Sequence, residues 1–326
     1  MTGGVVRVAA AVILRDDGAV LLAQRPAGKP YAGWWEFPGG KLEAGETPRE
    51  ALDRELREEL GLVVRRASSW FVQRYAYPHA NVELNFFRVF SFDGEPVGHD
   101  GQAFAWQRPG AFDVEPLLPA NTRVLAALLL PPVLGITCAS DLGEEAFLER
   151  AEAAFRAGLK LVQIREKTWP STRLDDFVRR LAPLARRRQV SLVLNGTAAD
   201  ARRLALDGVH WTSGALAAAT ARPDVRLLGA SCHTADELAR AADLGADYAV
   251  LGPLRPTPTH PDATPIGWDG FAALIAGARL PVYALGGLTR DDLDAAIDRG
   301  AHGVALRSGA WNPAPASRAR MRTDLR

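Results

Sequence analysis

Residues 38–62, "PGGKLEAGETPREALDRELREELGL", carry the strongest structural signal in this chain of 326 residues. Thr47 is a residue type that caps a helix, and Glu50, three positions later, completes a capping box. Gly61 is typical of the residue at which a helix ends. The stretch therefore predicts a glycine-rich loop followed by a helix over about 47–60.

Three glutamates crowd one side of this predicted helix. Glu55, Glu58 and Glu59 fall within an arc of roughly 100°, beside an apolar leucine face. Such a cluster is most often a solvated flank of an amphipathic helix. Oxygen ligands on one rigid element also suit a hard cation, Mg²⁺ or alternatively Mn²⁺. Gly39 and Gly40 supply a tight loop that lets backbone groups approach a metal and phosphates, so the context favours a metal site.

Composition narrows the possible functions. The chain is 48% hydrophobic, as expected of a globular protein with about two domains. A formal net charge of +1 gives no general case for direct nucleic-acid or membrane binding. Cys138 and Cys232 cannot form a disulfide framework and lack zinc-site spacing. No apolar run reaches the roughly 20 residues that span a bilayer. We therefore expect a cytoplasmic protein.

The chain divides into two parts with different patterns. The first is α+β, with the predicted helix among four β-type runs: 6–14, 19–25, 70–77 and 82–92. An apolar helical stretch over 121–130 closes it, and Pro131 marks the boundary. We predict domains over 1–130 and 133–312, followed by a flexible tail over 313–326.

The second part repeats a strand-then-helix pattern. Eight apolar runs alternate with amphipathic segments: "VLGITCA", "LKLVQIR", "VSLVLN", "DGVHW", "RLLGASC", "DYAVLGP", "PVYALGG" and "HGVALRSG". This pattern predicts an α/β domain with the (β/α)8 TIM-barrel fold, and an open doubly wound sheet is the competing arrangement.

Barrel enzymes place their chemistry at the C-terminal ends of the strands. The candidate ligand-binding residues at these ends are Arg165, Lys167, Asn195, Ser231, Thr257, Thr259, Gly286, Gly287 and Ser308. Glycine-rich segments after the last two strands are typical of a phosphate cup. Taken singly, each glycine pair is better explained as a plain turn, and His210 as a hydrogen-bonded structural histidine.

From Gly40 onward the sequence resembles the Nudix box over all of its 23 positions: a glycine, five residues, Glu46, seven residues, then "RELREELGL". The resemblance implies an α+β Nudix fold and hydrolysis of a nucleoside diphosphate linkage by water. It also implies that Arg54 and Glu46 orient the loop and helix. Magnesium would be held by Glu55, Glu58, Glu59 and the carbonyl group of Gly39, and one box glutamate would activate water.

The whole first part, over about 5–130, is similar to the MutT-type Nudix hydrolases, which cleave 8-oxo-dGTP. This similarity implies that Asn121 hydrogen-bonds the purine edge and that Arg25 and Phe37 contact the nucleotide. Without it, Asn121 is at least as well explained as a helix cap and Arg25 as a surface charge. Ala105 stands where the family has a further glutamate. Asp100 or Gln102 substitutes for it, or one metal site is weaker.

The second part, over about 133–311, resembles the thiamine phosphate synthase and TenI family. The synthase holds magnesium diphosphate through aspartates, and here Gly196 and "WTSG" occupy those places. The TenI resemblance instead implies a thiazole tautomerase in which His233 transfers protons, as a histidine near neutrality can. Binding of a phosphate ligand without turnover is an equal alternative. Cys232 is expected to be a buried strand residue.

These observations predict a hydrolase that converts 8-oxo-dGTP to the monophosphate and pyrophosphate, fused to a barrel that takes a thiazole or thiamine phosphate. A second hypothesis has the first domain hydrolyse diphosphates of thiamine-pathway compounds, with the barrel binding the product. A third makes the barrel a non-catalytic ligand sensor that controls the hydrolase.

Overall fold

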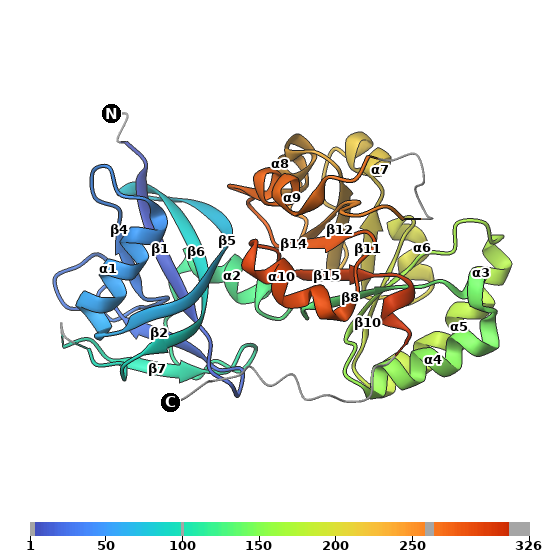
Figure 1. The fold of residues 1–326 in the computed structure, drawn as a ribbon, viewed down its shortest axis with the longest axis horizontal. Helices are drawn as coiled ribbons and strands as arrows, with labels where there is room; N and C mark the ends of the chain where they lie inside the picture. The colour runs from blue at the N-terminus through green and yellow to red at the C-terminus, as the bar shows by residue number, and fades with distance from the viewer. Residues whose placement is uncertain (1–3, 99–100, 258–263, 313–326) are drawn as a thin grey trace. The chain divides into compact units, whose positions relative to one another are not determined.

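The computed structural model describes residues 4–98, 101–257 and 264–312. The chain forms two compact units, with the change from one to the other between Leu129 and Leu130 (Figure 1). Asp100, Thr259 and the predicted tail over 313–326 lie outside the described residues. Within the described part of the chain, no helix is both long enough and apolar enough to cross a membrane.

The first unit is built on two sheets. One has the strand order β4-β1-β6-β5 and the other β3-β2-β7. The strands are β1 (Val6–Ile13), β2 (Val20–Gln24), β3 (Trp35–Glu36), β4 (Gly39–Lys41), β5 (Val63–Tyr77), β6 (Ala80–Asp93) and β7 (Phe104–Gln107). The four predicted β-type runs are confirmed as β1, β2, β5 and β6. The short strands β3, β4 and β7 were not among the predicted runs.

Helix α1 (Pro48–Leu60) follows β4 and has the predicted ends. The Thr47 hydroxyl accepts a hydrogen bond from the Glu50 amide at 3.3 Å, and the Glu50 carboxylate accepts one from the Thr47 amide at 2.8 Å. Gly61 ends the helix with a left-handed φ of 68°. The apolar face of α1 is fully buried, and it packs with Ala9, Ala11 and Ile13 of β1. This packing fixes the acidic side of the helix relative to the sheet.

The closing helix is shorter than predicted. A 3₁₀ turn, η1 (Pro119–Asn121), leads into α2 (Thr122–Ala127), which ends before the prolines that were expected to stop it. Asn121 has right-handed helical backbone angles and makes no capping hydrogen bond with its side chain. The interpretation of Asn121 as a helix cap is therefore wrong, because a cap needs an extended backbone that aims the side chain at the first turn.

The second unit is a closed parallel barrel, which confirms the predicted TIM-barrel fold. The alternative prediction of an open doubly wound sheet is wrong. Its strand order is β10-β11-β12-β13-β14-β15-β8-β9, and β9 pairs with β10 to close the ring. The eight predicted runs become β8 (Val133–Ile136), β9 (Leu161–Ile164), β10 (Ser191–Leu194), β11 (Gly208–Trp211), β12 (Leu227–Cys232), β13 (Tyr248–Leu251), β14 (Val282–Leu285) and β15 (Gly303–Leu306).

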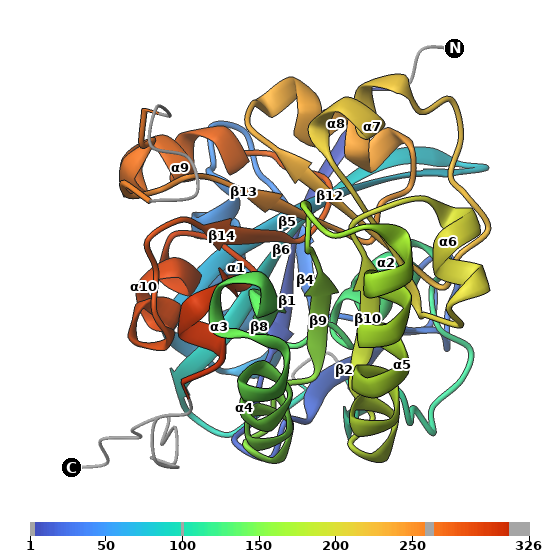
Figure 2. The ribbon, with the colours of Figure 1, turned by 90° about the vertical axis from the view of Figure 1, so that its right-hand side faces the viewer.

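Helices surround these strands (Figure 2). They are α3 (Ala139–Leu142), α4 (Glu144–Arg156), α5 (Ser171–Arg187), α6 (Ala198–Arg203), α7 (Ser213–Ala218), α8 (Ala235–Asp243), α9 (Gly267–Ile275) and α10 (Leu293–Asp298). Inside the ring, Leu134, Tyr248 and Tyr283 belong to a separate apolar cluster. A Cβ atom at Gly229 would lie 2.3 Å from the Tyr248 ring, so only glycine leaves room for this tyrosine. The barrel is a packed core that is open to ligands at its end.

Thr47→Ala should destabilise the first unit by about 1 kcal/mol, because the first turn of α1 loses its capping oxygen. Urea unfolding followed by tryptophan fluorescence measures the loss. Thr47→Ser retains a hydroxyl and should unfold at nearly the wild-type midpoint. An alanine variant with an unchanged midpoint would show that this cap does not stabilise the helix.

Candidate functional site

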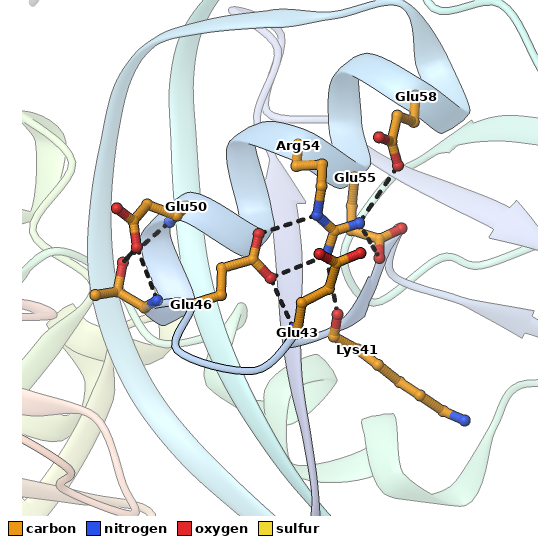
Figure 3. A network of polar contacts seen from close by, with 8 residues as sticks. Lys41, Glu43, Glu46, Glu50, Arg54, Glu55 and Glu58 are labelled. Atoms are coloured by element: carbon orange, nitrogen blue, oxygen red, sulfur yellow. Dashed lines mark hydrogen bonds and ion pairs between the residues drawn. The ribbon is translucent and has the colours of Figure 1, made fainter.

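Arg54 lies among the carboxylates of α1 and of the loop before it (Figure 3). Its guanidinium donates hydrogen bonds to both Glu46 oxygens, at 2.9 and 3.0 Å. It also donates to Glu55 at 2.9 Å, to Glu58 at 3.3 Å and to the Lys41 carbonyl oxygen at 3.0 Å. These contacts tie the loop to the helix, the arrangement that the resemblance implied for Arg54 and Glu46.

The same contacts set the charges of this network. The hydrogen bond to Glu46 is the largest of the effects that raise the pKa of the Arg54 guanidinium. The hydrogen bond from Arg54, followed by one from the Glu43 amide, lowers the pKa of the Glu46 carboxyl group. Both groups are therefore ionised at neutral pH. The crowding of glutamates on α1 is relieved within the protein itself, by Arg54 at Glu55 and Glu58 and by Lys29, which lies 4.0 Å from Glu59.

A cavity of about 510 Å³ lies beside α1. Glu55 and Glu59 line it together with Gly39 and Gly40. The Glu55 carboxylate packs so closely against the loop that a Cβ atom at Gly40 would lie 2.0 Å from it. Glu58 is not among the lining residues, and its side chain is 63% exposed. The structure thus brings two of the three box glutamates to the cavity.

This donor set fits a hard divalent cation, although it is not closed around one. Among the residues that the structure describes, no three histidine, cysteine or acidic side chains form a compact metal site. Glu55, Glu59 and the backbone at Gly39 border one space and offer only oxygen ligands, which Mg²⁺ prefers. Glu58 accepts from Arg54 through one carboxylate oxygen and is not among the lining residues. Nudix hydrolases generally use such an ion.

Asn121 lies at the same cavity with an unusual environment. Its side chain is 3% exposed, and its amide nitrogen has no hydrogen-bond partner in the described structure. A buried amide without a partner is costly, so this nitrogen is suited to donate to a ligand. Gln102 also lines the cavity, whereas Ala105 is paired with Leu22 in the sheet. Of the two substitutes considered for the missing glutamate, Gln102 is the one that the structure describes at this site.

Arg25 lines the cavity but is held by a carboxylate. It donates to the two Glu36 oxygens at 2.5 and 2.7 Å and to the Pro30 carbonyl oxygen at 2.8 Å. Burial raises the pKa of Glu36, and the Arg25 charge opposes that effect. Phe37 does not line the cavity: it is 4% exposed and packs against Phe86 in the core.

Three rings that the sequence analysis missed also border the cavity. The Tyr77 ring centroid lies 5.3 Å from that of Tyr31 and 5.4 Å from that of His79. Burial raises the pKa of Tyr77 to about 12, so its hydroxyl stays protonated. The sequence signal for Tyr77 and His79 was the run of aromatic residues in "RYAYPHA", and that for Tyr31 was the aromatic segment "PYAGWW". Aromatic faces suit contact with a nucleotide base.

The barrel has its own cavity, of about 360 Å³. It gathers His233 and all of the predicted binding residues that the structure describes: Arg165, Lys167, Asn195, Ser231, Thr257, Gly286, Gly287 and Ser308. Gly286 and Gly287 have φ values of 112° and 65°, which favour glycine. Arg307 and Gln163 also line this cavity and were not predicted. In the sequence, each is only a polar residue within or just after an apolar run, and such residues are too common to predict a binding site.

His233 is held in one orientation. Its Nδ1 lies 2.9 Å from the Gly252 carbonyl oxygen. Because a carbonyl oxygen only accepts, Nδ1 carries the proton in a neutral ring and Nε2 is left as an acceptor. His233 lines the cavity, so this ring is available for proton transfer there.

His210 supports the cavity from inside the barrel. Its Nε2 lies 3.0 Å from the Ser231 hydroxyl and its Nδ1 3.2 Å from the Tyr248 hydroxyl. Burial, with a smaller effect of Arg165, lowers the pKa of His210 to about 3. His210 is thus a neutral structural histidine that orients Ser231. Cys232 is fully buried, and burial raises the pKa of its thiol to about 12.

Comparisons with known proteins agree with this division. Residues 133–310 match the thiamine monophosphate synthase family, and residues 5–128 match the NUDIX domain family. An 8-oxo-dGTP diphosphatase of Haemophilus influenzae is 39% identical over 125 residues, covering 38% of this chain and 92% of that protein. The CTP pyrophosphohydrolase of Escherichia coli is 41% identical over 130 residues, covering 38% and 91%.

The barrel has relatives of its own. A thiamine-phosphate synthase of a Roseiflexus species is 36% identical over 184 residues, which cover 54% of this chain and 78% of that protein. Each half therefore matches most of the length of a protein that resembles it. The chain belongs to the thiamine monophosphate synthase family through its barrel and carries an N-terminal Nudix hydrolase domain.

Proposed function

We propose that the Nudix domain is a magnesium-dependent diphosphatase of MutT type that acts in the cytoplasm. It converts 8-oxo-dGTP to 8-oxo-dGMP and pyrophosphate, which removes an oxidised nucleotide before DNA synthesis can use it. The observation that carries this proposal is the buried, unbonded amide nitrogen of Asn121 in the cavity that Glu55 and Glu59 also line. The similarity to an 8-oxo-dGTP diphosphatase supports it.

Recognition of the base follows from the chemistry of the lining side chains. Asn121 offers an amide donor and acceptor side by side, which match the edge of a purine. Tyr31 and Tyr77 offer ring faces that can pack against the base. A ligand that satisfies the Asn121 amide removes the cost of burying it unpaired, so the site favours a base with a matching acceptor.

The acidic end of the cavity would carry the hydrolysis. Bound magnesium would neutralise part of the phosphate charge and would make the phosphorus more open to attack by water. Glu55 and Glu59 would hold the ion, while Arg54 ties their helix to the loop through Glu55 and the Lys41 carbonyl oxygen. A box glutamate accepts a proton from the attacking water. The water oxygen bonds to one phosphorus of the linkage between the α- and β-phosphates as the bridging P–O bond breaks, which leaves 8-oxo-dGMP and pyrophosphate.

Glu59→Gln should lower pyrophosphate release by at least about tenfold, because the metal site loses a ligand charge. Release from 8-oxo-dGTP with Mg²⁺ is measured over time. Asp53→Asn is the matched control, since Asp53 is on the same helix and pairs with Arg49 at 3.0 Å rather than lining the cavity. Equal rates in both variants would contradict the assignment of Glu59.

Asn121→Ala should lower kcat/KM for 8-oxo-dGTP by about tenfold or more, because a hydrogen bond to the base is lost. A panel of 8-oxo-dGTP, dGTP, CTP and thiamine diphosphate, with pyrophosphate and phosphate measured separately, tests this. Asn81→Ala changes an exposed asparagine of β6 and should leave the order of preference intact. A preference that survives the loss of Asn121 would reject the purine-binding role.

The fusion to the barrel favours a second candidate function. The Nudix domain would hydrolyse diphosphates of thiamine-pathway compounds, and the cation-lined barrel cavity would bind the product. In that case thiamine diphosphate would be hydrolysed with the highest kcat/KM of the compounds in the panel, and Asn121→Ala would change that value little.

For the barrel, we propose binding of a thiazole or thiamine phosphate, with His233 as the proton-transfer group of a tautomerase. Gly196 and the segment 211–214 stand in place of aspartates, so synthase chemistry is not proposed. Binding without turnover, including a sensor that controls the hydrolase, is the alternative. The single orientation of His233 supports the tautomerase.

His233→Gln should slow proton exchange on a bound thiazole phosphate by at least about a hundredfold, because the ring acceptor is removed. Deuterium exchange into the thiazole, followed by NMR, measures this. Binding of the same compound is measured by calorimetry in parallel. Wild-type protein that binds it but exchanges no proton would favour the non-catalytic alternative.

A further inference from the structure

We infer that Arg307 is an anion-binding residue of the barrel cavity. With Arg165 and Lys167 it would hold the phosphate group of the ligand directly, without a divalent metal ion. The ligand class is a phosphate or diphosphate ester of a small heterocycle. This inference deepens the proposed ligand binding by the barrel and rests on it.

Closure of the barrel brings the three cations together. Arg165 and Lys167 follow β9, and Arg307 follows β15, more than a hundred positions further along the chain. Strand β8 lies between β9 and β15 and pairs with both. The C-terminal ends of these strands therefore meet at one side of the ring, and all three side chains line the cavity of about 360 Å³.

Among the residues that the structure describes, no carboxylate lines the cavity beside these cations, and Asp141, which pairs with Arg307, is not a lining residue. Glu166, which lies between two of the cations in sequence, turns to α3 and accepts hydrogen bonds from the amides of Ala139 and Ser140, at 2.8 and 3.0 Å. Within the described part of the chain Arg165 and Lys167 form no ion pair, although the Glu166 charge raises the pKa of Arg165 against the larger lowering effects. A metal cation would find no anionic ligand among these lining residues, whereas a phosphate would find three cationic side chains.

The cations also repel one another. The Arg165 charge is the largest of the effects that lower the pKa of Lys167. Burial, followed by the Arg307 charge, lowers the pKa of Arg165. An anion among the three groups would relieve this repulsion. The geometry and the charges thus favour the same kind of ligand.

Arg307 has a donor ready for that ligand. Its Nη1 lies 2.6 Å from Asp141, which orients the guanidinium. Its Nε is buried and has no hydrogen-bond partner in the described structure. A guanidinium presents donors in a planar fork that matches phosphate oxygens. Gly286, Gly287 and Ser308 line the same cavity and can add backbone amide and hydroxyl donors.

Calorimetry on the full chain in EDTA tests the inference. The probes are inorganic phosphate, inorganic pyrophosphate and thiazole phosphate. We expect wild-type protein to bind at least one phosphate probe without metal, and Arg307→Gln to weaken that binding by at least about tenfold. Tighter binding of thiazole phosphate than of either inorganic probe identifies an ester site, and equal binding identifies a site for the free anion.

Two further variants control for charge and for folding. Arg226→Gln makes the same change near the N-terminal ends of the strands, where Arg226 pairs with Asp207 at 2.7 Å, and should bind as wild type does. Arg307→Lys keeps the charge but loses the fork, so we expect intermediate affinity. Melting curves, and pyrophosphate release by the Nudix domain, show whether each variant is folded. If Arg307→Gln does not fold, the affinity of Arg307→Lys tests the role of Arg307 in its place.

The possible failures are distinguishable. Wild-type binding that Arg307→Gln and Arg307→Lys leave unchanged would overturn the role of Arg307 while the proposed barrel ligand stands. Binding that requires added Mg²⁺ would overturn direct anion binding. Absence of binding by wild-type protein to every probe, with and without Mg²⁺, would overturn both the inference and the proposed function of the barrel.

Discussion

The contacts of Arg54 are the constraint on which the Nudix half depends. Without a cation between them, Glu46, Glu55 and Glu58 would push the loop away from α1 and open the acidic end of the cavity. One guanidinium holds all three and also binds the Lys41 carbonyl oxygen. This arrangement explains why the carboxylates do not surround a metal position completely. Arg54 binds oxygens of Glu55 and Glu58 that would otherwise be available to an ion.

The two cavities differ in the charged side chains that a phosphate group would meet. The Nudix cavity has the α1 carboxylates at one end, so a phosphate at that end needs a cation between them, although Arg25, Lys29 and Lys41 also line this cavity. The barrel cavity has cations and no described carboxylate, so a phosphate can approach directly. In the barrel cavity, the Gly252 carbonyl oxygen fixes the orientation of His233. In the Nudix cavity, the amide nitrogen of Asn121 has no hydrogen-bond partner in the described structure. The difference in charge separates their ligands even though both carry phosphate.

Sequence reasoning succeeded where the signal is local. The ends of α1 followed from Thr47 and Gly61, and the eight barrel strands from apolar runs, because each depends on neighbouring residues. Strands β3, β4 and β7 were missed because two to four residues form a strand only through distant partners. The burial of Phe37, the bond between Arg25 and Glu36, and the pairing of Arg307 with Asp141 likewise depend on tertiary contacts.

The contacts of Arg54 are also confined to a short piece of chain, from Lys41 to Glu58. Little loop-closure entropy is lost in forming them, and the apolar face of α1 packs on β1 of the same domain. A motif with such short-range connections does not rely on residues of a second domain. Joining genes end to end can therefore place it on a new protein without redesign, which is the physical condition for a modular fusion of this kind.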